Sequence, residues 1–430
     1  MKKLVVKRRI DLGRSNIRTF NGENDFVLDP SIYKEIDVEA PIRKDIADPY
    51  NDFIILAANV TQIVGRRFVK GQAMSAFKAI ATQADNQDLK VDQESSYINF
   101  AYTVARAVVD EMDKQADMFS YKEQALTDIG VCVPTAEHFS QNGEKMKEKL
   151  AGEYIVHFPV LDKSISFKCT TDSLVIAPEG PVALTPAFDS EQADTLDSEI
   201  GVIIDVGYGS TDITLVIQGE PQGDTARSFP YGGITVESAV ASALERDGYS
   251  SSASSVKMAI TRGYVKSGTN IQAVDNLVAT CKTKLAQKLK QSVTSVLAES
   301  FYQASDLSYY FPTGRNFKTV DTSKPDYKDA GCLATEFEKA WGKRLEKINT
   351  VEVKPEWKCV DRTAPMRDGV YPTIPVDLYE LANVYGLSSI LDCNDFQDED
   401  ALEDEDYSED VCEEVAEDVE ELEPANSEVI

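Results

Sequence analysis

Two short turns set between apolar runs constrain the fold of this chain more than any other feature. The first reads IDLGRSNI (residues 10–17) and the second IDVGYGSTD (residues 204–212). In each turn, an apolar run ends in an Asp. Gly and small hydroxylated residues come next, and a second apolar run then begins. A single Asp-x-Gly turn is common in proteins. The pair is more informative, and it predicts one such hairpin in each of two domains.

The residues of these turns suit the phosphates of a nucleotide. Glycine lets backbone N–H groups approach a phosphate closely, and an Asp at the end of each strand can hold a hydrated Mg²⁺. No G-x-x-x-x-G-K-[ST] motif is present, so a P-loop is excluded. The candidate phosphate-binding residues are Asp11, Gly13, Ser15, Asn16, Gly207, Tyr208, Gly209, Ser210 and Thr211.

Periodicity along the chain predicts an α/β protein. A length of 430 residues favours two domains. Strands are expected at residues 4–10, 16–20, 129–133 and 308–311, and a strand–turn–strand unit at 200–217. Helical spacing of apolar residues is found at 96–112, 235–244, 271–297, 333–345 and 376–391. Because strands and helices interleave throughout the chain, the fold class is expected to be α/β.

Composition excludes several other classes of protein. There is no apolar run of about 18 residues that could span a membrane, and the first residues lack the features of a signal peptide. The seven cysteines never form a C-x-x-C pair and there are two histidines, which argues against a zinc site and a disulfide framework. These features predict a protein of a reducing cytoplasm.

Negative charge is concentrated at the C-terminal end. Residues 392–430 hold 19 Asp or Glu and no Lys or Arg, which leaves about −10 of the formal −29 on the rest of the chain. Like charges and few large apolar groups predict a disordered tail, either solubilising, or spacing filaments or binding a basic partner. No basic surface for DNA is indicated, so any action on DNA is expected to need an adaptor.

Basic residues occur at two other notable places. Lys7, Arg8 and Arg9 lie in the first strand, where one of them could reach the phosphates or alternate residues could be exposed. Residues 65–71 (GRRFVKG) read as a turn and strand of a small subdomain, either a filament contact or a solvated loop.

With the two turns in place, the chain resembles the actin/Hsp70/sugar-kinase superfamily, and within it the ParM family of plasmid-segregating filament proteins. Further matching stretches are VCVPTAE (131–137), 144–150, APEGPV (177–182), FPYGGIT (229–235), YFPTGRN (310–316) and 376–387. The resemblance covers about residues 1–391. The third turn departs from it, with Pro-Thr-Gly-Arg where the family has a run of glycines, so the preference between ATP and GTP stays open.

The resemblance implies an actin/Hsp70-like fold, with two domains that each hold a mixed sheet and flanking helices around a nucleotide cleft. It implies domain I at 1–195 with a small subdomain at about 30–90, domain II at 196–375, a closing helix at 376–391 and the acidic tail at 392–430. Glu179 falls on the position of the catalytic glutamate that orients or deprotonates the attacking water. Asp205 would join it in catalysis, with Asp11 and Asp205 holding Mg²⁺ through water. Gly232 and Gly233 would lie near the ribose and phosphate, and Gly314 and Arg315 beside the adenine.

The implied function is an ATPase, with GTP as an alternative substrate, whose filaments segregate plasmid DNA through a DNA-binding adaptor of the ParR type. A filament-free ATPase or a small-molecule kinase of the same superfamily is the alternative, although no carboxylate base for a second substrate stands out. A chaperone would need a peptide-binding domain that the acidic tail cannot supply. A membrane-bound actin would need an amphipathic anchor.

Overall fold

The computed structural model describes residues 4–13, 16–77, 89–114, 124–267, 270–317, 333–342, 345–348 and 353–399. Contacts within the chain divide it into a unit of Met1–Asp392 and a unit of Cys393–Ile430. The strands of the described residues belong to the first unit. Of the second unit, the described part is the end of one helix, α11 (Leu378–Glu399).

The larger sheet of the described chain has the order β20-β19-β3-β2-β1-β7-β9-β8-β5-β6-β4, with β10 beside β7. Its central strand β1 runs antiparallel to β2 and parallel to β7. The strands are β1 (Val5–Asp11), β2 (Asn16–Phe20), β3 (Asp25–Pro30), β4 (Tyr33–Ile36), β5 (Asp52–Ala57), β6 (Arg66–Lys70), β7 (Ala125–Val133), β8 (Gly152–Phe158), β9 (Lys163–Cys169), β10 (Leu174–Pro178), β19 (Lys358–Asp361) and β20 (Thr373–Ile374).

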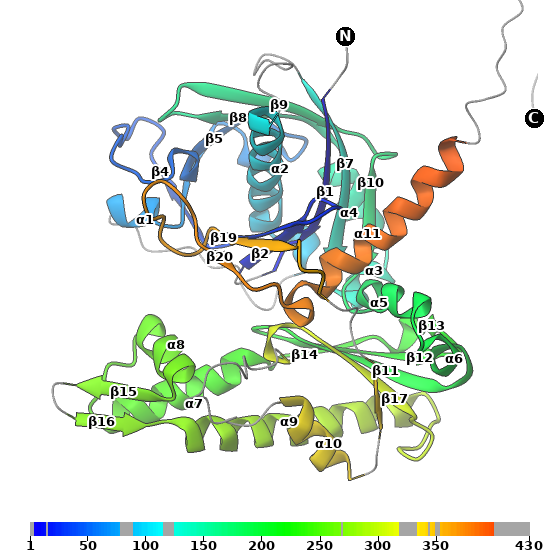
Figure 1. Ribbon diagram of the computed structural model, residues 1–430. Coiled ribbons are helices and arrows are strands. Elements are labelled where there is room, and N and C mark those ends of the chain that lie inside the picture. The colour runs from blue at the N-terminus through cyan, green and yellow to red at the C-terminus, as the bar shows by residue number, and fades with distance from the viewer. Residues whose placement is uncertain are drawn as a thin grey trace, which may run out of the picture. The chain divides into compact units, whose positions relative to one another are not determined.

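Helices cover both faces of this sheet (Figure 1). On one face, α2 (Glu94–Lys114) packs its apolar side, including Val104 and Val108, against Val6 and Ile10 of β1. On the other, α11 contributes Leu387 to a cluster with Cys132. The remaining helices of this part are α1 (Ala73–Ala76), α3 (Thr135–His138) and α4 (Asn142–Leu150), with the 3-10 turns η1 (Pro49–Asn51), η2 (Thr61–Ile63) and η3 (Lys90–Asp92).

The smaller sheet of the described chain has the order β13-β12-β11-β17-β18, with β14 beside β12. Its strands are β11 (Ile200–Val206), β12 (Thr211–Ile217), β13 (Glu220–Pro221), β14 (Arg227–Phe229), β17 (Tyr309–Thr313) and β18 (Glu346–Lys347). Because side chains alternate along a strand, Val202 and Ile204 of β11 face α7 (Gly233–Arg246), α9 (Asp275–Glu299) and α10 (Leu333–Trp341), whereas Ile203 faces Leu196 of α6 (Ala193–Ser198).

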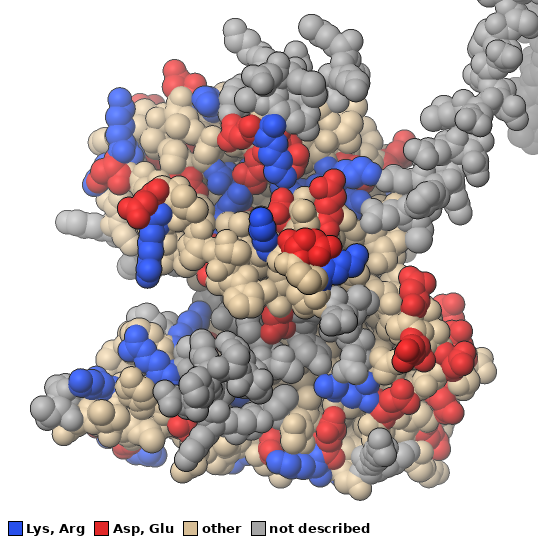
Figure 2. Space-filling model, viewed as in Figure 1, with Lys and Arg blue, Asp and Glu red and all other residues tan. Residues whose placement is uncertain are grey.

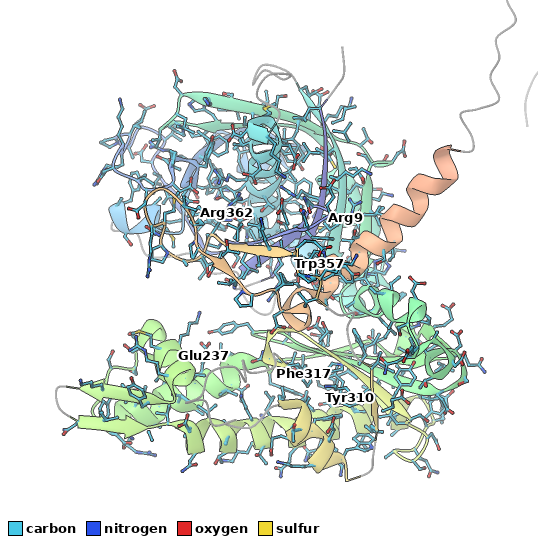
Figure 3. The ribbon with its side chains drawn as sticks, viewed as in Figure 1. Arg9, Glu237, Tyr310, Phe317, Trp357 and Arg362 are labelled. Carbon is cyan, nitrogen blue, oxygen red and sulfur yellow. The ribbon has the colours of Figure 1, made fainter. Side chains whose placement is uncertain are left out.

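The other elements complete the chain between and after the sheets. They are α5 (Pro181–Leu184), α8 (Ala253–Arg262), the hairpin of β15 (Tyr264–Ser267) and β16 (Asn270–Ala273), and the 3-10 turns η4 (Thr185–Asp189), η5 (Gly223–Thr225) and η6 (Arg315–Phe317). Trp357, labelled in Figure 3, precedes β19 and packs on Phe20, Phe26 and Tyr385. Among the described residues, no helix is long and apolar enough to cross a membrane.

The two sheets repeat one arrangement at the predicted turns. Hairpin β1–β2 has β7 as a parallel neighbour, and hairpin β11–β12 has β17 in the same position. Asp11 pairs with Arg18 across the first hairpin, and Asp205 pairs with Asp212 across the second. The predicted α/β class, with strand–turn–strand units at both motifs, is therefore confirmed.

One predicted helix was wrong in part. Residues 271–273 were expected to be helical, but they form β16 and pair with β15. The acidic tail was expected from residue 392, and the end of α11 extends into its first residues, as far as Glu399. No Gly or Pro occurs from residue 387 to 399, and a helix already anchored by packing propagates at one hydrogen bond per residue. Residues 400–430 lie outside the described part of the chain.

Candidate functional site

The first hairpin brings a buried carboxylate against a guanidinium. Asp11 is 4% exposed, and its Oδ2 accepts a hydrogen bond from Arg18 Nη1 at 3.0 Å. A Cβ on Gly13 would meet the carbonyl oxygen of Asn16 at 2.5 Å and Arg18 Nη1 at 2.7 Å, so this turn requires glycine. The side chain of Ser15, a predicted phosphate ligand, lies outside the described residues.

The second hairpin is closed by backbone hydrogen bonds. Gly207 N–H donates to the Ser210 carbonyl at 3.0 Å, and the carbonyl of Gly207 accepts from Gly233 N–H at 3.1 Å. The Thr211 hydroxyl donates to the Tyr231 carbonyl at 2.7 Å, so its proton serves the fold. The Tyr208 hydroxyl donates to Glu237, labelled in Figure 3, at 3.0 Å.

Three predicted turns pack on one another around this hairpin. A Cβ on Gly232 would meet the Gly207 carbonyl oxygen at 2.4 Å, and one on Gly314 would meet the Val206 carbonyl oxygen at 2.5 Å and Asp205 Oδ1 at 2.6 Å. Gly314 also has a φ of +92°, which favours glycine. The structure therefore brings residues 205–211, 232–233 and 314 together; of Arg315 only the backbone, in η6, is described.

Asn316 fixes this group of turns, and the sequence analysis did not name it among the candidate site residues. Its Nδ2 donates to the carbonyls of Val206 at 3.0 Å and Gly207 at 2.8 Å, and its side chain lies against Gly233. The neighbouring Phe317, labelled in Figure 3, is buried in the core of the smaller sheet. An Asn just after the third turn was the available signal, because Asn side chains often bond backbone groups at turns.

The loop that carries Glu179 is held from three directions. Glu179 N–H donates to the Val133 carbonyl at 2.7 Å, and the Thr135 hydroxyl donates to the Glu179 carbonyl at 2.5 Å. The next residue, Gly180, donates its N–H to Asn383 Oδ1 at 2.8 Å. The loop after β10 is thereby tied to the end of β7, to the start of α3 and to α11.

Asn383 also contacts the second hairpin. Its Nδ2 donates to Asp205 Oδ2 at 3.4 Å while its Oδ1 accepts from Gly180. One amide on α11 therefore joins the loop of Glu179 to the strand end of Asp205. The sequence analysis assigned this helix to closure of the fold and missed the role of Asn383, since an Asn in a helix gives no signal of its partners.

Acidic side chains converge here in the protein interior. Burial, with the charges of Asp212 and Asp11, raises the pKa of Asp205 to about 7. Burial, with Asp11 and Asp205, raises the pKa of Glu179, although Lys90 opposes this rise. Asp11, Glu179 and Asp205 therefore lie close enough for their charges to act on one another, and the site favours a bound cation.

The carboxylates of the site are of the type that holds a hydrated Mg²⁺. Within the described residues, no group of three or more His, Cys, Asp or Glu side chains is arranged to hold a metal. Mg²⁺ in nucleotide sites typically keeps several waters and uses one or two carboxylates together with phosphate oxygens. Asp11 and Asp205, at the ends of equivalent strands, supply that limited set.

The fold identifies the general class of this protein. No family model matches the chain, and no curated protein matches it. Solved structures of actin-like proteins do match over most of its length. At 12–15% sequence identity the likeness shows the fold, and the chain has the actin-like fold.

Particular neighbours include bacterial and archaeal actin homologues. The actin-like protein Alp7A is 14% identical, with 93% of this chain and 99% of Alp7A covered and a TM-score of 0.64. The archaeal actin homologue Ta0583 is 14% identical over 90% of this chain and 99% of its own, with a TM-score of 0.59, and its complex with ADP gives 0.58. ParM in a 15-stranded filament from Clostridium botulinum is 15% identical over 90% and 99%, with a TM-score of 0.57. The likeness to ParM expected from the sequence is thus confirmed for the fold.

Proposed function

We propose that this protein is an actin-like nucleoside triphosphatase that assembles into filaments. The observation that carries this proposal is the convergence of two equivalent hairpins, through Asp11 and Asp205, on the loop of Glu179. One hairpin in each sheet suits a substrate with a row of phosphates, because two sets of backbone and side-chain donors can bind it from opposite sides.

The side chains of the site take separate roles in the proposed reaction. Gly13, Asn16 and Ser15 bind phosphate from the first hairpin, and Gly207, Tyr208, Gly209, Ser210 and Thr211 from the second, Thr211 through its backbone. Arg18 adds positive charge to the first hairpin. Asp11 and Asp205 hold Mg²⁺ through water, and this ion would neutralise charge on the phosphates. Gly232, Gly233, Gly314 and Arg315 form the nucleoside side.

Glu179 acts on water in this proposal. Its backbone is fixed at both the N–H and the carbonyl, so its carboxylate is presented by a rigid loop. A raised pKa brings the group near the pH at which general acid–base catalysis is most effective. Glu179 therefore orients the attacking water and accepts its proton, and Asp205 contributes to catalysis through its place at the second hairpin.

Self-assembly is the part of the proposal supported by the neighbours. ParM from Clostridium botulinum was solved as a filament, and Ta0583 was solved with ADP. The resemblance of the sequence to ParM is the basis for three further parts of the proposal. These are ATP or GTP as the substrate, plasmid DNA as the cargo and an adaptor of the ParR type. A filament-free ATPase remains the second candidate, because the interior of the fold supports nucleotide chemistry with or without assembly.

The first experiment measures light scattering and phosphate release together after Mg-ATP or Mg-GTP is added to the purified protein. We expect scattering to rise and phosphate to follow, with the faster nucleotide identifying the substrate. Phosphate release without a rise in scattering would support the alternative function, an ATPase that does not form filaments. Neither signal, together with no nucleotide binding, would refute the proposal.

Replacement of Glu179 by Gln tests the proposed chemistry. We expect phosphate release to slow by about 10²–10³-fold, the usual scale for loss of a general base, while filaments still form and persist. Pelleting and phosphate assays on the same sample measure both. A matched control is Glu153→Gln, an exposed residue on β8, which should leave both unchanged. Normal phosphate release from Glu179→Gln would remove this residue from the mechanism.

A further inference from the structure

A buried lysine lies against Glu179 and has no role in the site as described so far. Lys90, in η3, is 5% exposed, and its Nζ makes a short ion pair with Glu179 Oε1. Burial lowers the pKa of Lys90, but the charges of Glu179 and Asp11 outweigh burial and raise it above its ordinary value. The ammonium therefore stays charged between the loop of Glu179 and the first hairpin.

The backbone beneath Lys90 is held by several side chains. Glu137 accepts hydrogen bonds from Lys90 N–H at 3.0 Å and from Val91 N–H at 3.4 Å. The Tyr97 hydroxyl and, at 2.9 Å, Lys149 Nζ donate to the Val91 carbonyl. The fold thus fixes η3 and directs Lys90 inward.

Stability alone gives little reason for this pair. A buried ion pair is seldom more stable than apolar side chains of similar size, because both ions lose their hydration. The long stem of lysine and its three rotatable donors instead allow the ammonium to exchange one anionic partner for another within reach. Its neighbours Glu179 and Asp11 are the two groups that the proposed function places around the phosphates.

We propose that Lys90 is a ligand of the terminal phosphate of a nucleoside triphosphate, and that Glu179 holds it when no terminal phosphate is present. This inference rests on the proposed function. Lys90 turns its ammonium from the carboxylate to the phosphate, and Glu179 is left with a free carboxylate to accept a hydrogen bond from water. A diphosphate lacks the group that Lys90 binds, so the ion pair stays closed. Lys90 thereby links recognition of the triphosphate to release of Glu179.

The test compares binding of two nucleotides to the full chain below the concentration at which it assembles. The probes are ADP and a non-hydrolysable ATP analogue with a β,γ-imido bridge, each with Mg²⁺, and calorimetry gives both dissociation constants. We expect Lys90→Met to weaken binding of the triphosphate analogue by at least about tenfold, the scale of a charge-assisted hydrogen bond. Binding of ADP should weaken by less than about threefold. Lys90→Arg, which keeps the charge, should restore most of the preference.

Lys168→Met is the matched control. The Lys168 side chain is 44% exposed and pairs with Glu153 at 3.7 Å, away from η3. The ratio of the two dissociation constants should stay at the wild-type value in this variant. A wild-type ratio in Lys90→Met, or equal weakening of both nucleotides, would overturn the inference.

Lys90→Met leaves the Glu179 carboxylate buried without its partner, so this variant can fail to fold. A second pair of variants keeps the inference testable in that case. Comparing Glu179→Gln with Lys90→Met/Glu179→Gln removes that unpaired charge. The same selective loss of triphosphate binding is expected, and its absence would refute the role of Lys90. If wild-type protein binds neither nucleotide, the proposed function itself fails, which this comparison separates from failure of Lys90 alone.

Discussion

At the scale of single residues, charge pairing in the interior was the least predictable property of the chain. One of the basic residues of the first strand was a candidate for the phosphates, but Arg9 instead donates to the Asp128 carbonyl at 3.2 Å, and Arg8 pairs with Asp110 at 3.7 Å. The cation beside Asp11 is Arg18, which the sequence analysis missed. Its position could be found only from the register of the hairpin, which sets the two residues opposite each other.

The raised pKa of Asp205 makes the stability of the nucleotide-free protein depend on pH. The folded state binds this proton more tightly than the unfolded state, so stability falls as pH rises from about 4 to about 7. Asp205→Asn removes this loss. We expect the variant to gain little at pH 4 and on the order of 1–3 kcal/mol at pH 8, seen as a rise of several degrees in Tm.

Thermal unfolding across this pH range measures the effect of Asp205→Asn. Glu220→Gln, an exposed carboxylate on β13, is the control and should show no such trend. If the difference in Tm between Asp205→Asn and the wild type did not change with pH, the raised pKa of Asp205 would be contradicted.

At the scale of elements, the sequence predicted the two hairpins because the Asp-Gly turns and their flanking apolar runs are local signals. Most edge strands were not predicted. β13, β18 and β20 have two residues each. β13 pairs with the neighbouring strand β12, whereas β18 pairs with the more distant β17. Residues 270–273 carry apolar spacing that suits the helix after them, yet pairing with β15 decides their structure. The partner that a short strand will pair with cannot be read from a single sequence.

The packing of the three turns predicts a strong effect at Gly314. Gly314 and Gly342 both have positive φ, at +92° and +76°, but a Cβ on Gly342 would meet nothing within 4 Å. Both Ala variants suffer the cost of the left-handed conformation, about 1 kcal/mol, and only Gly314→Ala also collides with backbone. We expect Gly314→Ala to lose about 2 kcal/mol more than Gly342→Ala in urea unfolding. Equal losses of stability in the two variants would show that the turns can shift to accommodate a Cβ at little cost.

Helix α11 gives a second prediction at this scale. Asn383→Ala removes the acceptor of Gly180 N–H and a donor to Asp205, and leaves buried polar groups unsatisfied. We expect a loss of about 1–3 kcal/mol in stability and slower phosphate release. Asn59→Ala is the control, because Asn59 also bonds the backbone of another element, at Glu148, away from the site. Phosphate release at the wild-type rate would deny Asn383 a positioning role.

At the scale of the whole molecule, charge is the dominant property. Figure 2 shows acidic side chains gathering over the region of α6 and β13, where the exposed residues include Asp194, Asp197, Glu199 and Glu220. Together with the acidic residues beyond 392, they contribute to a formal net charge of −29. Molecules with this charge repel one another at low salt.

Removal of the acidic segment tests this repulsion between the proposed filaments. Since α11 extends to Glu399, the cut belongs after residue 399 and leaves Leu391 packed as in the full chain. We expect the truncated protein to bundle more at low salt, with the difference fading as ionic strength approaches about 1 M, where screening acts over roughly 3 Å. Sedimentation at low speed measures bundles. A tail with Asn and Gln in place of its acids should behave like the truncation, and equal bundling by all three proteins would exclude a role for this charge.

The internal ion pairs of the site have a consequence for exchange of nucleotide. Arg18 with Asp11 and Lys90 with Glu179 give each buried cation an anionic partner inside the protein itself. In the proposed ATPase, a subunit that has released its product would keep these two cations paired, so neither of them would favour opening of the interior. Such a subunit would remain folded while empty, and the supply of fresh nucleotide would set how quickly it returns to use.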